Sequence, residues 1–170
     1  MNSSSANFLD ALGASQTLSA QMKHELDTLG YTVVHNVVDA QWLSEMRLLI
    51  DTLVEREGDN LAMEHHQEAT ATRIIPGTHL RPELPEEVLA DPEQAHPDEI
   101  VFAAPAGSVM IYNAHAWHGG TRNREGSRRR VLHGLYIDRA DTPQQDQRRW
   151  LTPETASRLT PAQKWLLDVE

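Results

Sequence analysis

The chain has 170 residues, a formal net charge of −10 and no cysteine. This length is typical of one domain with its own core, and the negative charge argues against nucleic acid or an anionic membrane as the main partner. The lack of cysteine excludes disulfides, thiolate metal ligands and cysteine nucleophiles, and the lack of a long apolar run or signal-peptide pattern makes the cytoplasm the default expectation.

The N-terminal residues 1–16 are predicted to form a loose arm with one turn around Phe8. Residues 17–57 are predicted to hold two helices with a strand between them. Thr17 is suited to cap the first helix and Gly30 to end it, because apolar residues between them recur at near-helical spacing. The residues of this stripe are Leu18, Met22, Leu26 and Leu29.

A β-rich run over 31–38 predicts the strand, and Asp39 is suited to be the N-cap of a helix over 40–57. An apolar stripe along one side supports this second helix. Its members are Leu43, Met46, Ile50 and Leu53. Residues 56–72 lose the periodicity and predict a loop.

The middle of the chain predicts short strands separated by an exposed excursion. Arg73–Ile75 is a brief strand ended by a Pro-Gly pair. Residues 80–99 contain four prolines and predict an exposed segment with one short helix near 86–90. Residues 100–103 give the next strand.

A pair of strands around a loop is predicted over 102–137. Ser108–Tyr112 forms the first strand, and Arg129–Ile137 forms the second, with Arg129 and His133 on the same face by the two-residue period. The loop between them contains His118, so this imidazole and the Arg129 guanidinium could face one cavity. Such a pair suits a metal ligand beside a carboxylate anchor. The competing interpretation is a structural histidine and a solvated basic loop.

The tail, residues 150–169, predicts C-terminal helices that start at Thr152-Pro153 and Thr160-Pro161. Together the predicted elements make a single domain over 1–170. Its class is mainly β with flanking helices, a partial double-stranded β-helix or jelly-roll of the cupin kind whose β-core remnant covers 71–137.

Two motifs resemble the phytanoyl-CoA dioxygenase family. The first is ATRIIPGTH at 71–79, and the second runs from Trp117-His118-Gly119-Gly120 through Asn123 to Arg129. The resemblance implies an Fe(II)- and 2-oxoglutarate-dependent oxygenase on a double-stranded β-helix. Carried over by position, His118 matches the C-terminal metal histidine, and Arg129 matches the arginine that binds the distal carboxylate of 2-oxoglutarate.

The family's His-x-Asp pair is not found in a matching context, which predicts an internal deletion between about residue 57 and residue 72. His66 and Glu68 formally read His-x-Glu and are the candidate replacement ligands, against the interpretation of an exposed polar turn. His79 is expected to shape the cavity mouth, and His115 to have a loop or core role.

Three functions stay open at this point. The first is a working oxygenase that uses 2-oxoglutarate and O2 to hydroxylate a small organic or acyl substrate, with its site completed by His66 and Glu68 or by a partner chain. The second is an internally deleted, inactive remnant that acts as a binding or interaction module. The third is a non-enzymatic β-core module that binds a carboxylate ligand or another protein. Exposed strand edges favour a homodimer.

Overall fold

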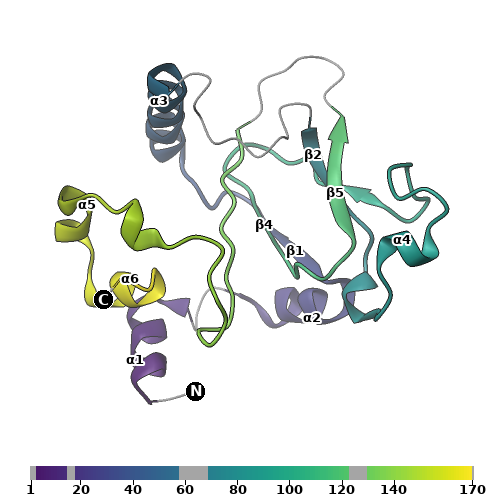
Figure 1. Ribbon diagram of the computed structural model, residues 1–170, viewed down its shortest axis with the longest axis horizontal. Helices are drawn as coiled ribbons and strands as arrows, with labels where there is room; N and C mark the ends of the chain where they lie inside the picture. The colour runs from purple at the N-terminus through teal and green to yellow at the C-terminus, as the bar shows by residue number, and fades with distance from the viewer. Residues whose placement is uncertain (1–2, 15–17, 58–68, 123–129, 170) are drawn as a thin grey trace. The chain divides into compact units, whose positions relative to one another are not determined.

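The structure is a computed structural model and describes residues 3–14, 18–57, 69–122 and 130–169 (Figure 1). Its backbone contacts divide the chain into two units, which are described one at a time. Unit 1 combines Met1–Ser19 with Leu132–Glu170, and unit 2 is Ala20–Val131. The expected single domain over 1–170 stays a prediction.

Unit 2 contains two small antiparallel sheets (Figure 1). In the first, β1 (Tyr31–Val34) pairs with β4 (Val109–Tyr112). In the second, the order is β3 (Ile100–Val101), β2 (Ala69–Ile74) and β5 (His118–Arg122). The described residues therefore confirm antiparallel strands accompanied by helices, which is a coarser statement than the expected jelly-roll.

The helices of unit 2 follow the capping residues seen in the sequence. Gly30 has φ 81° and ends α2 (Ala20–Leu29), donating its N–H to the Leu26 carbonyl at 3.2 Å. Asp39 caps α3 (Ala40–Glu57), because its Oδ1 accepts the Trp42 N–H at 2.8 Å. Both predicted helix boundaries are confirmed, while Thr17 lies outside the described residues. The short elements η3 (Thr78–Leu80) and α4 (Pro85–Val88) follow within the excursion.

The buried centre of unit 2 lies where β1 and β2 meet their neighbours. Ile74 and Thr32 are each 1% exposed. Thr32 is polar, and its hydroxyl is satisfied because it donates to Glu25 Oε2 on α2 at 2.6 Å. Gln21 donates to the other oxygen of this carboxylate at 3.0 Å. The Thr32 hydrogen bond, followed by that of Gln21, lowers the pKa of the Glu25 carboxyl below its ordinary value.

One strand prediction is wrong. Residues 130–137, expected within a strand, form no strand and expose their side chains, whereas His118–Arg122, expected within a loop, forms β5. A strand needs a ladder partner, and β2 takes the glycine-rich segment as its neighbour. Gly119 lies opposite Arg73 in this ladder, and an added Cβ atom would make an ordinary contact with the Arg73 Nε at 3.5 Å.

Unit 1 consists of helices and irregular segments. Thr152 and Thr160 cap α5 (Pro153–Arg158) and α6 (Pro161–Leu166), and each hydroxyl accepts a backbone N–H at 3.2 Å. Both predicted caps are therefore confirmed, each with proline at the first helical position. A short turn, η4 (Gln147–Arg149), precedes them.

The expected loose arm over 1–16 contains a helix instead, α1 (Ser3–Ala11), which packs against α6. The Phe8 ring stacks on Trp165 with centroids 5.4 Å apart, and the Arg139 guanidinium lies 4.6 Å from the centroid of the same indole. Arg139 also donates to Asp168 Oδ1 at 2.8 Å. Phe8 and Trp165 are far apart in the sequence, so the residues around Phe8 alone do not predict the helix that this contact stabilises.

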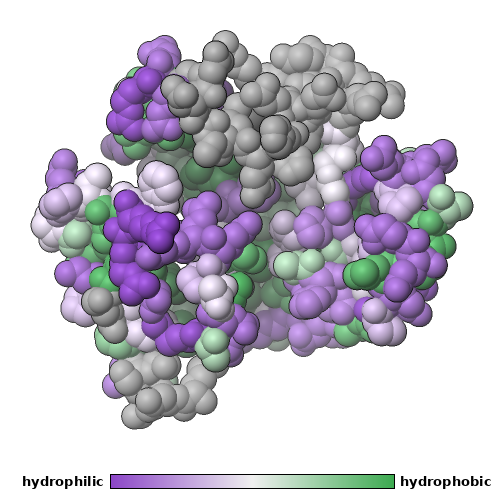
Figure 2. All heavy atoms as spheres, viewed as in Figure 1, coloured by the Kyte–Doolittle hydropathy of each residue, from purple (hydrophilic) through white to green (hydrophobic). Residues whose placement is uncertain are grey.

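Helices in the described ranges lack the combined length and apolar character that a membrane crossing requires. Around α4, hydrophobic residues lie scattered among hydrophilic ones on the visible face (Figure 2). Leu80 and Leu84 are 70% and 61% exposed there.

Candidate functional site

His118 is the first residue of β5 and lies opposite Ile74 in the ladder. Its ring meets the Tyr112 ring edge-on, with centroids 5.0 Å apart. Its Nδ1 is 2.7 Å from the Ala116 carbonyl oxygen. A carbonyl oxygen can only accept, so Nδ1 carries the proton, and the neutral ring keeps its lone pair on Nε2. The imidazole is thus held on two sides with its second nitrogen ready to bind.

This arrangement fits one ligand of a metal site. Metal-binding histidines usually donate their other N–H to a carbonyl or carboxylate, which fixes the tautomer and the ring orientation. Across the part of the chain that the structure describes, however, no three histidine, aspartate or glutamate side chains gather closely enough to hold a metal ion. The residues present fit a single ligand, and a full set is not assembled among them.

The other predicted site residues do not fall within the described ranges. His66 and Glu68 lie in the segment 58–68, and Arg129 ends the segment 123–129. Their roles as replacement ligands and as carboxylate anchor therefore stay predictions. The neighbouring Arg130 is described, and its guanidinium binds Asp51 of α3, with Nε 3.0 Å from Oδ1.

His79 has a structural role. Its Nε2 lies 3.2 Å from the Asp27 carbonyl oxygen, which places the N–H on that nitrogen and satisfies a free carbonyl at the end of α2. Its Nδ1 is buried without a hydrogen-bond partner in the described structure. The ring covers Gly30, where a Cβ atom would stand 2.6 Å from Nδ1. The PGTH motif thus fastens β2 to α2.

Arg73, in the middle of the ATRIIPGTH motif, was not singled out by the sequence reasoning. Its guanidinium donates to the carbonyl oxygens of Gln94 at 2.8 Å and Pro92 at 2.9 Å, and lies 3.4 Å from Glu99 Oε2. That same carboxylate oxygen accepts the His96 N–H at 3.0 Å. The feature of the sequence that could have indicated this role is an arginine inside a β-rich run, directly before a proline-rich excursion.

A cleft of about 410 Å³ lies between the Pro76–Arg81 segment and the His96–Asp98 turn of the excursion. Trp117 forms part of its lining, is 7% exposed, and donates its indole N–H to the Glu83 carbonyl at 3.1 Å. Trp117 directly precedes β5, and His118 is not part of the cleft lining. Because adjacent residues of an extended chain point to opposite faces, we expect the cleft and the His118 ring to lie on different faces.

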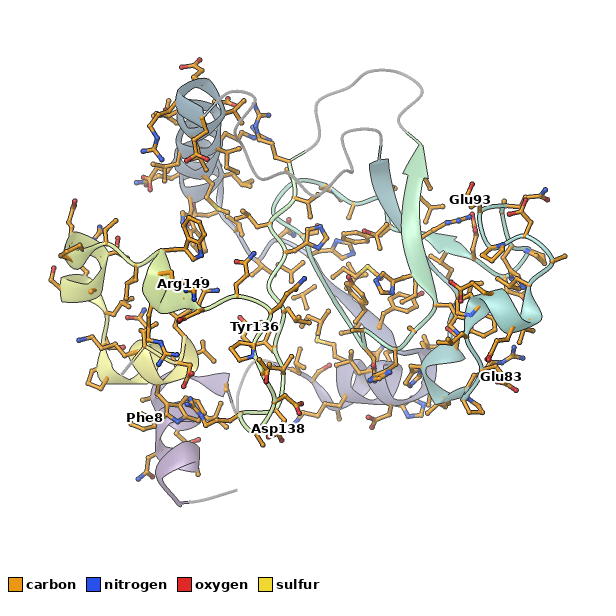
Figure 3. The ribbon with its side chains drawn as sticks, in the orientation of Figure 1. Phe8, Glu83, Glu93, Tyr136, Asp138 and Arg149 are labelled. Carbon is orange, nitrogen blue, oxygen red and sulfur yellow. The ribbon has the colours of Figure 1, made fainter. Side chains whose placement is uncertain are left out.

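Figure 3 shows two glutamates of this excursion, Glu83 before α4 and Glu93 after it. Both come from the excursion that also carries His96 and Asp98. Arg73 ties the part after α4 to β2, so this part has a fixed attachment to the sheet.

Comparison with known proteins gives one match. The family model described as phytanoyl-CoA dioxygenase matches residues 60–131, which is less than half of the chain. No curated protein and no solved structure matches. The matched range contains β2 to β5, the ATRIIPGTH motif and His118, and it lies wholly within unit 2. Residues 60–131 of this protein are therefore similar to the phytanoyl-CoA dioxygenase family.

Proposed function

We propose that this protein is an Fe(II)/2-oxoglutarate-dependent oxygenase of jelly-roll class, with His118 as one of its metal ligands. The supporting observation is the hydrogen bond from His118 Nδ1 to the Ala116 carbonyl, which leaves Nε2 unprotonated within a segment of the matching family.

The remaining roles are assigned to three residues outside the described ranges. His66 and Glu68 complete a set of two histidines and one carboxylate, which is the donor set typical of non-heme iron oxygenases. Arg129 binds the distal carboxylate of 2-oxoglutarate, because a planar guanidinium offers two parallel hydrogen bonds. Iron and 2-oxoglutarate, when bound, supply the oxidising chemistry that inserts oxygen from O2 into a C–H bond of a small organic or acyl substrate.

Within the described residues, the contribution of the chain is orientation. The Ala116 carbonyl fixes the tautomer of His118, and the edge of the Tyr112 ring restricts rotation of the imidazole. Both contacts come from the turn and strand directly before β5, so the ligand is positioned by its immediate neighbours in sequence. Ile74, which pairs with His118 in the ladder, is 1% exposed.

The deciding experiment is an anaerobic titration with Fe(II) and 2-oxoglutarate, followed by the visible metal-to-ligand charge-transfer absorption. We expect a band that disappears in His118→Ala and weakens in Arg129→Ala. The matched control is His115→Ala, an exposed histidine of the same turn, which should keep the band.

A well-folded wild-type sample without the band would reject the oxygenase proposal. It would favour the alternative, an inactive internally deleted remnant that acts as a binding or interaction module. A band that survives in His118→Ala would instead place the metal on other residues.

A further inference from the structure

We infer that the cleft between Pro76–Arg81 and His96–Asp98 binds a small zwitterionic ligand of the α-amino acid class. The inference concerns the face of β5 that does not carry His118, and it does not depend on iron. Its volume of about 410 Å³ lies in the range of small-molecule sites, and its lining is mixed rather than purely apolar.

The cleft offers a cation for a carboxylate. Arg81 lines it, and its guanidinium lies 5.3 Å from the centre of the Trp117 ring. Among the described residues, this guanidinium contacts the face of the Trp117 ring rather than a carboxylate. Its N–H donors therefore remain available to an anionic ligand. Stacking on a nearly buried indole also limits the rotation of the side chain, which lowers the entropic cost of binding an anion.

A second donor and one acceptor come from the opposite wall. The His96 Nδ1 accepts the Asp98 backbone N–H at 3.2 Å, so the proton of the neutral ring is on Nε2, which becomes a hydrogen-bond donor. The Asp98 side chain is 79% exposed and also lines the cleft. A ligand carboxylate suits Arg81 and His96, whereas the Asp98 carboxylate suits an ammonium group on the same ligand.

This second wall is held in place by a largely buried ion pair. The Arg73 and Glu99 side chains are 18% and 16% exposed and lie 3.4 Å apart. Glu99 accepts the His96 N–H, and Arg73 donates to the carbonyl of Gln94, two residues before His96. These contacts fix the backbone that carries His96 and Asp98, so the two walls are arranged before any ligand arrives.

The test uses three probes that differ by one charged group: norleucine, hexanoate, which lacks the ammonium, and pentylamine, which lacks the carboxylate. Each is titrated into the full ¹⁵N-labelled chain while the Trp117 indole N–H signal is followed, with Trp117→Phe used to assign it. We expect norleucine to shift this signal at the lowest concentration, hexanoate to bind at least about fivefold more weakly, and pentylamine to give no saturable shift.

Two substitutions and one control separate the roles. Arg81→Gln should weaken norleucine binding by about tenfold or more, and Asp98→Asn should bring norleucine down to the level of hexanoate. The control is Arg47→Gln, an exposed arginine of α3 outside the cleft lining, which should change nothing. Equal binding of norleucine to wild type and Arg81→Gln would overturn the inference, as would the lack of any saturable shift with well-dispersed wild-type spectra.

Discussion

Gly30 ends α2 at a point where the His79 ring leaves no room for a side chain. The backbone there has φ 81°, a left-handed conformation that favours glycine. A Cβ atom would in addition stand 2.6 Å from His79 Nδ1. Glycine is therefore required here for two reasons, the left-handed backbone and the lack of space beside His79. Only the left-handed backbone can be predicted from the sequence, because a glycine that follows a helical pattern typically ends the helix.

Gly30→Ala is expected to destabilise unit 2 more than Gly77→Ala does. Gly77 also has a left-handed backbone, φ 77°, but its added Cβ would meet only an ordinary contact at 3.6 Å. The left-handed conformation should cost about 1–2 kcal/mol at both positions, and the overlap with His79 should add roughly 1 kcal/mol or more at Gly30. Urea unfolding of both variants measures the difference, and equal losses would contradict the steric argument.

The carboxylate of Glu25 makes stability depend on pH in the acid range. Hydrogen bonds from Thr32 and then Gln21 lower its pKa in the folded state. A depressed pKa means that this stabilisation is complete above the ordinary glutamate value of about 4.3 and is lost as pH falls through the lower folded value. Urea midpoints measured between pH 6 and pH 3 should therefore fall less in Glu25→Gln than in wild type.

The matched control for this experiment is Glu45→Gln, because Glu45 accepts a hydrogen bond from Gln41 on the exposed side of α3 but none from a buried hydroxyl. The midpoint of Glu45→Gln should follow wild type through the acid range. If Glu25→Gln and wild type lose stability in parallel, the carboxylate is not a source of the acid sensitivity.

Among the secondary-structure elements, helix boundaries could be predicted from neighbouring residues, whereas the pairing of strands could not. Asp39, Thr152 and Thr160 act as caps within a few residues of their own position, so their sequence context was sufficient. Which segment forms β5 depends on which segment pairs with β2. An alternating pattern, such as that of residues 130–137, does not specify the partner strand. Long-range contacts decided both α1 and β5.

The cap of α3 gives a test at this scale. Asp39→Ala removes the acceptor of the Trp42 N–H and should destabilise the helix by about 1 kcal/mol. Ser44→Ala, at an exposed position inside the same helix, should be neutral or slightly stabilising because alanine has the higher helix propensity. Amide exchange in the first turn of α3 should accelerate only in Asp39→Ala. Unchanged exchange there would show that the cap contributes nothing.

At the scale of the whole molecule, the apolar surface favours self-association. All 18 residues of α3 are at least partly exposed, and Trp42, Leu48 and Leu49 are 54%, 70% and 69% exposed. Apolar area of this kind is commonly covered by a partner. We expect a homodimer in light scattering at micromolar concentration, and Leu49→Glu should shift it toward monomer. A wild-type monomer would contradict this prediction.

The candidate site was predictable only in part. The family motif pointed to His118, but the proton position on its ring follows from the Ala116 carbonyl, which sequence alone does not place. The cleft on the other face depends on Arg73 holding a distant turn, and no spacing rule connects residues so far apart. His66, Glu68 and Arg129 stay predictions.

The stacking of Phe8 on Trp165 has a consequence for the order of folding during synthesis. Unit 1 joins α1 (Ser3–Ala11) to α6 (Pro161–Leu166), so α1 cannot meet its partner until the residues between them have been made. Unit 2 is continuous in sequence, so its contacts can form before the residues that follow Val131 have been made. We therefore expect the aromatic contact to form last.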